Sequence, residues 1–179
     1  MINDLLYLAR VEADKIQLHL GQTTAKEIVN AVAVSFSEMT HEKKLKVKVD
    51  AQKDIPPFVT DAGKIQQVLE NYMSNAVKFT PEGGRIELKA NQLDEKTVRF
   101  SVIDTGCGIA EQDREKIFQK FGQVGSPLTR QSTGTGLGLA ISKELADMLA
   151  GSVGFDSKPD TGTTFWLDIP LNPAKEQQD

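Results

Sequence analysis

Apolar residues recur at intervals of three and four in several parts of the chain, which is the spacing of amphipathic helices. The first such run consists of Ile2, Leu5, Leu6, Ala9, Ala13 and Ile16. Its two heptads are fewer than the three or four that establish a coiled coil, so a helix packed on its own domain remains an alternative. A second helix is expected after the capping residues Thr23 and Thr24, and it runs to about Met39.

A long third helix is predicted to begin after Asp61, whose side chain can cap it, and to end near Thr80 and Pro81. One face of this helix carries the apolar residues Ile65, Leu69, Tyr72, Met73 and Ala76. Two shorter helices are expected over residues 111–118 and 139–149. Between them, residues 122–138 are rich in Gly, Ser, Thr and Gln without an apolar period, which predicts a mobile loop of a length that is usually functional or disordered.

Strict alternation of apolar and polar residues indicates the strands. It occurs in LKVKVDA (residues 45–51), which is predicted to be a half-buried strand. Further strands are predicted in EGGRIELKANQL, KTVRFSVID, SVGFD and TTFWLDIPL. A short loop at Asp94 to Lys96 predicts that the second and third of these strands form a hairpin. Helices interspersed with hairpin strands predict an α+β domain whose sheet is covered by helices on one face.

Composition narrows the class of protein. With 179 residues, of which 39% are hydrophobic and 26% charged, the chain can form one globular core of ordinary size or one domain plus an appendage. A net charge of −4 without a long cationic run favours neither nucleic acid nor an anionic membrane as partner. No apolar stretch reaches the roughly 18 to 20 residues that span a bilayer. The single Cys107 is interpreted as a turn residue, which makes a reducing cytoplasm the default location.

Three polar residues share one edge of the long helix. Asn71, Asn75 and Lys78 lie at i, i+4 and i+7, within roughly 60° of one another around the axis. A solvated helix face explains each residue taken alone. Asparagine is unfavourable inside helices, however, so two of them one turn apart indicate a ligand. Amide oxygens suit Mg²⁺, which combines one or two protein ligands with water and substrate phosphates, and Lys78 would contact those phosphates.

A glycine cluster, GTGLGLAIS, leads directly into the next helix. Gly134, Gly136 and Gly138 let the backbone approach an anion, and the free N–H groups at a helix start attract phosphate. The spacing fits neither the dinucleotide fingerprint nor the P-loop. Alone, the cluster is equally explained by a flexible loop with a helix cap.

The stretch SVIDTGCGI delivers Asp104 from an alternating run into a turn with two glycines. Read alone, Asp104 could be a general acid, a protease aspartate or the cap of a turn. The sequence D-T-G is also the signature of aspartic proteases, but such an enzyme needs two aspartates that share a proton, and only one D-T-G occurs here. That reading also leaves the asparagines and the glycine cluster unexplained.

Taken together, these segments resemble the catalytic ATP-binding domain of sensor histidine kinases, in the gyrase, Hsp90, histidine kinase and MutL superfamily. QVLENYMSNAVKFT resembles its N box, DTGCGI its G1 box, IFQKFGQ its F box, GTGLGLAIS its G2 box and DTGTTFWLDIPL its closing strand. The resemblance covers about residues 23–171 in the same order and spacing. It implies the Bergerat fold, a two-layer α/β sandwich with a mixed, mostly antiparallel sheet covered by helices on one face.

The resemblance also implies residue roles, with ATP and Mg²⁺ as cofactors. Asp104 would accept a hydrogen bond from the exocyclic amine of adenine, which an acceptor-only carboxylate suits and which disfavours GTP. Asn71 and Asn75 would coordinate Mg²⁺, Lys78 would contact phosphate, and Arg130 would contact the γ-phosphate. Other nucleotide contacts are implied at Gly106, Gly108, Ile109, Phe121, Thr133, Gly134, Thr135, Gly136, Leu137, Gly138 and Thr164. Phe118 and Phe121 would anchor the lid formed by the glycine cluster, with plain core packing as the alternative.

Hydrolysing members of the superfamily carry a glutamate general base where this chain has Asn71. An amide cannot take a proton from water at neutral pH, so fast hydrolysis is not expected, and Glu70 points about 100° away around the helix. Phosphoryl transfer needs positioning and charge stabilisation instead. The expected acceptor is a histidine on a dimerisation helix, because neither His19 nor His41 has the sequence context of an acceptor, and neither has Cys or carboxylate at metal-ligand spacing.

These implications define an expected domain organisation. Residues 1–20 would be the end of the second dimerisation helix, residues 21–171 the catalytic domain and residues 172–179 a polar tail. The expected partners are the phosphoacceptor and dimerisation domain of the same protein and the receiver domain of a response regulator, with no nucleic acid and no membrane contact. The full-length protein would be a homodimer. A non-catalytic module that senses ATP remains the alternative function.

Overall fold

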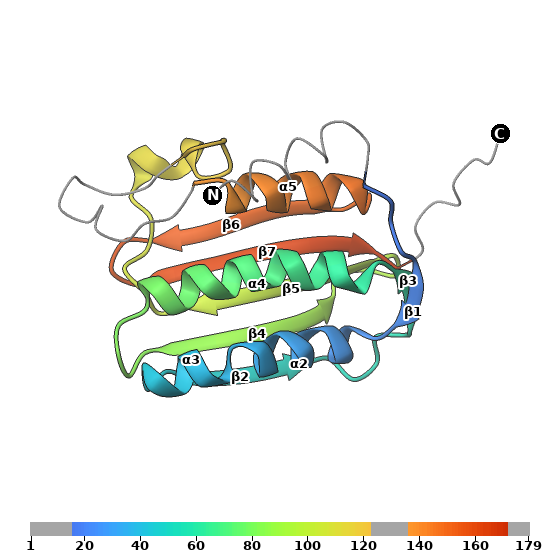
Figure 1. The fold of residues 1–179 in the computed structure, drawn as a ribbon, viewed down its shortest axis with the longest axis horizontal. Coiled ribbons are helices and arrows are strands. Elements are labelled where there is room, and N and C mark those ends of the chain that lie inside the picture. The colour runs from blue at the N-terminus through green and yellow to red at the C-terminus, as the bar shows by residue number, and fades with distance from the viewer. Residues whose placement is uncertain (1–15, 123–135, 172–179) are drawn as a thin grey trace.

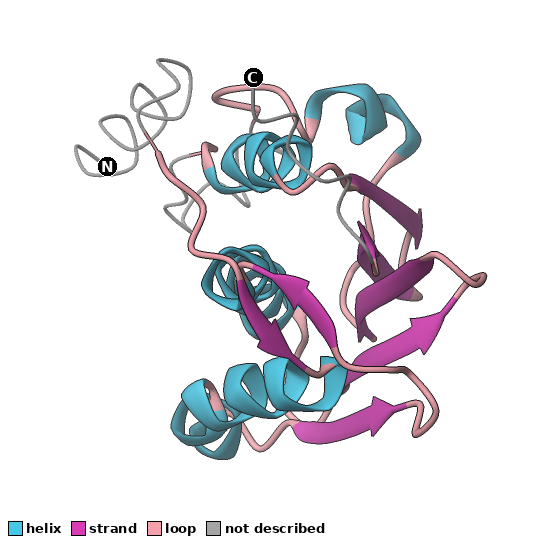
Figure 2. Ribbon diagram, turned by 90° about the vertical axis from the view of Figure 1, so that its right-hand side faces the viewer, coloured by secondary structure: helices cyan, strands magenta, loops and turns pink. Residues whose placement is uncertain are grey.

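The computed structural model describes residues 16–122 and 136–171, and these residues form two layers. One layer is a five-stranded sheet in the order β2 (Lys46–Ala51), β4 (Arg85–Gln92), β5 (Thr97–Asp104), β7 (Gly162–Pro170) and β6 (Ser152–Lys158). The other layer contains α2 (Ala25–Ser35), α4 (Ala62–Phe79) and α5 (Gly138–Met148), which lie side by side across one face of the sheet (Figures 1 and 2). The predicted α+β class and the one-sided helical cover are confirmed.

The sheet is mixed and mostly antiparallel, as expected. β4 and β5 form the predicted hairpin, and β7 pairs antiparallel with both β5 and β6. β2 pairs parallel with β4, because the chain crosses over the sheet through α4 between them. A second, two-stranded sheet of β1 (Gly21–Thr23) and β3 (Phe58–Thr60) was not predicted, since three-residue strands are too short to show alternation.

The core lies between the two layers. The five apolar residues predicted on one face of α4 are all buried, and Tyr72 stacks on Phe165 of β7 with ring centroids 5.2 Å apart. Alternate residues of β5, namely Val98, Phe100 and Val102, face the same core. α4 is therefore fixed on the sheet by its apolar stripe, and the stripe that carries Asn71, Asn75 and Lys78 lies at the margin of the contact.

Side chains define where the helices begin. Thr24 caps α2 in a reciprocal capping box with Glu27, and Asp61 caps α4 by accepting from the N–H of Lys64 at 3.1 Å. The other oxygen of Asp61 accepts from the N–H of His19 at 2.8 Å, which ties the N-terminal segment to α4. The predicted caps Thr24 and Asp61 are confirmed, whereas Thr23 is the last residue of β1.

Three predicted helices differ from the structure. The second helix does not run unbroken to Met39: it breaks at Phe36, whose side chain enters the core, and α3 (Ser37–Glu42) follows. Residues 16–20, predicted as the end of a dimerisation helix, form neither helix nor strand, and residues 1–15 lie outside the described part. The helix predicted over residues 111–118 is the 3₁₀ helix η1 (Glu111–Lys116).

The face of the sheet opposite the helices carries a polar cluster around Trp166 of β7. Arg99 of β5 forms two hydrogen bonds of 2.7 Å with the carboxylate of Asp168, and its guanidinium lies 4.6 Å from the indole centroid. On the neighbouring strand, Gly154 leaves space for the indole, because a Cβ at that position would overlap the ring. This cluster is well separated from the helical layer and its polar stripe.

Candidate functional site

The polar stripe of α4 faces the start of α5. Asn71, Asn75 and Lys78 are all half-buried, as expected for a stripe at the margin of a packed helix. The amide nitrogen of Asn71 donates to the hydroxyl of Ser142 at 2.8 Å, and that hydroxyl donates to the carbonyl of Gly138 at 3.0 Å. Ser142 therefore fixes the rotation of the Asn71 amide, so that its oxygen remains the group available to a cation.

Packing between α4 and α5 gives a structural reason for a glycine at position 138, in addition to its place in the glycine cluster. A Cβ at this position would overlap the side-chain amide of Asn71. The absence of a side chain lets the first turn of α5 approach α4 closely. The glycine thus brings the N–H groups at the start of α5 beside the stripe of α4, as phosphate binding at a helix start requires.

The C-terminal turn of α4 is held by Lys43, which follows α3. Its ammonium donates to the carbonyls of Val77 at 2.6 Å and Lys78 at 3.1 Å. These are carbonyls of the last helical turn, where a cation is favoured by the helix dipole. The turn so fixed carries Lys78 and Phe79, and the Lys78 ammonium lies 5.0 Å from the Phe79 ring centroid.

Asp104 ends β5 beneath the helical layer and is 8% exposed. Its carboxylate accepts from the N–H of Gly106 at 2.7 Å and from the backbone N–H of Thr163. Burial raises the pKa of Asp104 above its ordinary value, while these two backbone hydrogen bonds oppose the shift. The carboxylate is therefore oriented by the backbone on one side and retains lone pairs for a ligand.

The strand register does not place Thr164, a predicted nucleotide contact, beside Asp104. In the register of β5 and β7, Asp104 stands opposite Thr163, and Thr164 stands opposite Ile103. Since successive side chains of a strand alternate between its two faces, Thr164 points to the face away from Asp104. Thr163 is the residue that shares the face of the carboxylate, and it is buried beside it.

The turn after Asp104 packs against the turn between β6 and β7. The N–H of Asp160 donates to the carbonyl of Cys107 at 2.8 Å. Gly106 lies over the Phe79 carbonyl, where a Cβ would come within 2.8 Å of the oxygen. Gly108 has φ of +69° and contacts the Lys158 carbonyl. Both glycines are therefore required by backbone contacts, and only Gly106 lies on the α4 side of the turn.

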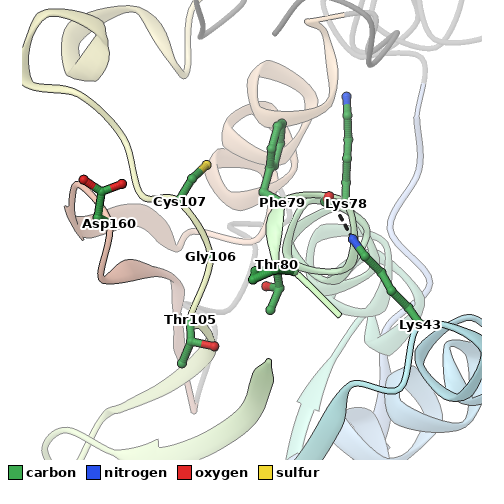
Figure 3. A pocket seen from close by; sticks show the side chains of 9 residues that line it. Lys43, Lys78, Phe79, Thr80, Thr105, Gly106, Cys107 and Asp160 are labelled. Carbon is green, nitrogen blue, oxygen red and sulfur yellow. Dashed lines mark hydrogen bonds between the residues drawn. The ribbon is translucent and has the colours of Figure 1, made fainter. Parts of the chain in front are cut away.

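A cavity of about 410 Å³ opens between this turn and the end of α4 (Figure 3). Lys78 and Gly106 line it, together with Lys43, Phe79, Thr80, Pro81, Thr105, Cys107 and Asp160, whereas Asn71, Asn75 and Asp104 are not among its lining residues. Phe79, Lys78 and Cys107 point the same way in this view, and the dashed line marks the bond from Lys43 to the Lys78 carbonyl. Phe79 is 42% exposed, an unusual exposure for a phenylalanine in a fixed helical turn.

Sequence reasoning missed Phe79, Lys43 and Ser142. Phe79 could have been found, because it lies one position after Lys78 and outside the apolar stripe of α4. Ser142 is 71 residues from Asn71 and Lys43 is 34 residues from Val77. Their roles depend on contacts between elements, for which the sequence carries no local signal.

Other predicted residues divide between core and periphery. Leu137 is 1% exposed and Ile109 is 8% exposed, so both are core residues, and the prediction that Leu137 contacts nucleotide is not supported by its position. Phe118 packs on Phe155 and Phe165, which confirms the core alternative for it. Phe121 is 63% exposed, and its backbone contacts Gly136, which has φ of +68°.

Arg130, Thr133, Gly134 and Thr135 lie outside the described residues. Within the described part, no group of three or more His, Cys, Asp or Glu side chains converges as a metal site would require. The donors suited to Mg²⁺ are instead the neutral amides of α4. In the same part of the chain, none of the helices has both the length and the apolar character that crossing a bilayer demands.

Comparisons with known proteins identify the family of this chain. The profile of the family described as "Histidine kinase-, DNA gyrase B-, and HSP90-like ATPase" matches residues 60–173. The sensor protein GacS of Pseudomonas syringae pv. syringae is 34% identical over 183 residues, which cover 100% of this chain and 20% of GacS. The chain thus spans about a fifth of the length of the first curated relatives it matches.

Two solved structures show the same fold. Full-length ShkA in complex with AMPPNP superposes with a TM-score of 0.85 and 36% identity, over 97% of this chain and 35% of ShkA. The histidine kinase ThkA in complex with the response regulator protein TrrA superposes with a TM-score of 0.73 and 25% identity, over 98% of this chain and 50% of ThkA.

Proposed function

Because the chain belongs to the histidine kinase-, DNA gyrase B- and HSP90-like ATPase family and is an ATP-binding domain of the sensor histidine kinase type, we propose that it transfers the γ-phosphoryl group of ATP to a histidine on a separate dimerisation helix. The observation that carries the nucleotide assignment is Asp104. A buried carboxylate, oriented by two backbone N–H groups, accepts from the 6-amino group of adenine and repels the 6-oxo group of guanine.

The residues around Asp104 suit the rest of the nucleotide. The exposed ring of Phe79, which lines the same cavity as Gly106, would offer a flat surface to the adenine base. Lys78 would contact the phosphates, and the N–H groups at the start of α5 would face them across Gly138. Gly134 and Gly136 would belong to a lid over the phosphates, and Arg130 would reach the γ-phosphate.

The amides of Asn71 and Asn75 would hold Mg²⁺, and the fixed oxygen of Asn71 fits this assignment. Bound there, Mg²⁺ would supply positive charge that offsets the charge of the phosphates. Asn71 would also limit the hydrolysis of ATP, because an amide cannot deprotonate the attacking water. The chain therefore holds the nucleotide ready for an acceptor rather than for solvent.

In the proposed reaction an imidazole nitrogen of the acceptor attacks the γ-phosphorus. A phosphorus–nitrogen bond forms as the bond to the bridging oxygen breaks, and ADP leaves with the electron pair. The imidazole then loses its proton to solvent. The contribution of this chain is to bind and orient ATP, and no described side chain needs to move a proton.

The proposed partners follow from this reaction. The acceptor histidine would lie on a phosphoacceptor and dimerisation domain of the same protein, which would be a homodimer. The phosphoryl group would pass to the receiver domain of a response regulator. The complex of ThkA with TrrA supports such a partner for this chain. Residues 21–171 would form the catalytic domain in this organisation, and residues 172–179 a polar tail.

Transfer in trans tests the function. The chain is mixed with Mg²⁺, γ-labelled ATP and a separately produced phosphoacceptor domain, and the label on that domain is measured over time. Wild type should transfer label, Asn75→Ala should transfer much less, and Asn30→Ala should match wild type because Asn30 is exposed on α2. Transfer by Asn75→Ala at the wild-type rate would contradict the mechanism. ATP binding without any transfer would favour the ATP-sensing module instead.

A further inference from the structure

Ser157 near the end of β6 is a buried hydroxyl group that joins several segments around Asp104. It is 4% exposed, and its oxygen lies within hydrogen-bond distance of three groups. The N–H of Ile109 donates to it at 2.8 Å. It donates to the carbonyl of Gly162 at 3.0 Å, and the Thr163 hydroxyl oxygen lies 2.9 Å away.

The three contacts determine the direction of the third hydrogen bond. A serine hydroxyl has one hydrogen and accepts two hydrogen bonds. The Gly162 carbonyl can only accept, so it takes the hydrogen of Ser157, and the N–H of Ile109 can only donate. All three contacts are satisfied as hydrogen bonds only when the hydroxyl of Thr163 donates to Ser157. With its hydrogen held there, the oxygen of Thr163 presents only lone pairs to any other group.

The backbone of Ser157 adds a further connection. Its carbonyl accepts from the guanidinium of Arg114 in η1. Ser157 thus joins β6 to the turn after Asp104, to η1 and to the start of β7. Asp104 is paired with Thr163 in the sheet and accepts from its N–H, so the residue that Ser157 orients is the immediate neighbour of the carboxylate.

We propose that Ser157 is a positioning residue for nucleotide selectivity, because it holds the Thr163 hydroxyl as a hydrogen-bond acceptor beside the Asp104 carboxylate. The inference rests on the proposed function, in which Asp104 faces the 6-position of the purine. Two neighbouring acceptors match a 6-amino group, a donor, and oppose a 6-oxo group, an acceptor. Without Ser157 the Thr163 hydroxyl turns freely and can donate to a 6-oxo group. The preference for 6-amino over 6-oxo purine nucleotides then falls.

The experiment compares the dissociation constants of ATP and inosine triphosphate, which differ at the 6-position and the adjacent ring nitrogen. Wild type should prefer ATP. Ser157→Ala should lower the ratio of the dissociation constant of inosine triphosphate to that of ATP about three- to tenfold, as the loss of one directed hydrogen bond implies. Ser101→Ala is the matched control, because Ser101 is a buried serine of β5 on the face away from Asp104.

Thr163→Val provides a second test that does not need the Ser157 variant to fold. It removes the oriented hydroxyl and should lower the same ratio by a similar factor, while the double variant should lower it no further than either single one. An equal weakening of both nucleotides in Ser157→Ala, with the ratio unchanged, would show a purely structural role and overturn the inference. So would an unchanged ratio in Thr163→Val. If wild type itself fails to bind ATP, the proposed function fails instead.

Discussion

The side chain of Asn71 in α4 donates a hydrogen bond of 2.8 Å to the hydroxyl of Ser142 in α5. This bond joins the helix that carries the proposed cation ligands to the helix that begins the proposed phosphate site. The relative position of the two ligand groups therefore depends on this bond as well as on the close packing of α5 against α4 at Gly138. Removing this hydrogen bond should therefore weaken the binding of Mg²⁺ without weakening the binding of the adenine base.

Ser142→Ala should weaken Mg²⁺-dependent ATP binding and leave Mg²⁺-free binding nearly unchanged, because the Asn71 amide becomes free to rotate. The loss of the bond should also lower the free energy of unfolding by about 1 kcal/mol. Titration calorimetry with and without Mg²⁺ measures the first effect. Ser35→Ala is the control, since Ser35 makes the same bond to a carbonyl four residues earlier without a partner on another helix. Equal losses with and without Mg²⁺ would contradict the assignment of Asn71.

Asp104 predicts a pH dependence of ATP affinity. Burial raises its pKa, so as pH falls through that raised value the carboxylate gains a proton and turns a donor toward the donor amine of adenine. Affinity should therefore fall on acidification. The effect on stability has the opposite sign: the native state binds this proton more tightly than the unfolded chain does, so the contribution of Asp104 to stability falls as pH rises through the raised pKa.

Asp104→Asn separates this dependence from the titration of ATP itself. The variant should bind ATP more weakly by about 1–3 kcal/mol at neutral pH, because an amide donor then faces the amine. Its residual affinity should retain only the pH dependence that belongs to the nucleotide. A pH profile parallel to that of wild type would contradict the role of Asp104.

Lys43→Met should weaken ATP binding, although no contact between Lys43 and the nucleotide is proposed. The ammonium holds two carbonyls of the last turn of α4, and Lys78 and Phe79 lie on that turn. Its loss should lower the free energy of unfolding by about 1–2 kcal/mol in a denaturant titration. Lys44→Met removes only an ion pair with Glu82 in which both side chains are largely exposed, so it should have little effect on either quantity. If the two variants behave alike, α4 does not depend on this contact.

Gly108→Ala should destabilise the fold more than Gly83→Ala. Both glycines have positive φ, which costs a residue with a side chain about 1–2 kcal/mol. At Gly83 a Cβ would meet no atom within 4 Å, whereas at Gly108 it would overlap the Lys158 carbonyl. Denaturant unfolding of the two variants measures the difference. Equal losses would show that the turn after Asp104 can move away from the turn after β6.

The periodicity of the sequence predicted the individual elements because each depends on neighbouring residues. The polar stripe at Asn71 and the caps at Thr24 and Asp61 follow from spacing within one helix. The choice between Thr163 and Thr164 does not, because it depends on how β7 is aligned with β5. Ser142, Lys43 and Ser157 act across contacts between distant segments, and each is an ordinary residue within its own element. The site is therefore predictable as separate motifs, while the groups that orient them require the fold.

Trp166 is the only tryptophan in the chain, and it lies on the face of the sheet away from α4. Its indole is in contact with Gly154 and the Arg99 guanidinium, both in the sheet itself. Intrinsic fluorescence should therefore change when the sheet unfolds and stay nearly constant when nucleotide binds on the other face. Every variant above can thus be followed by one native optical signal for stability, while affinity is measured independently and without an added label.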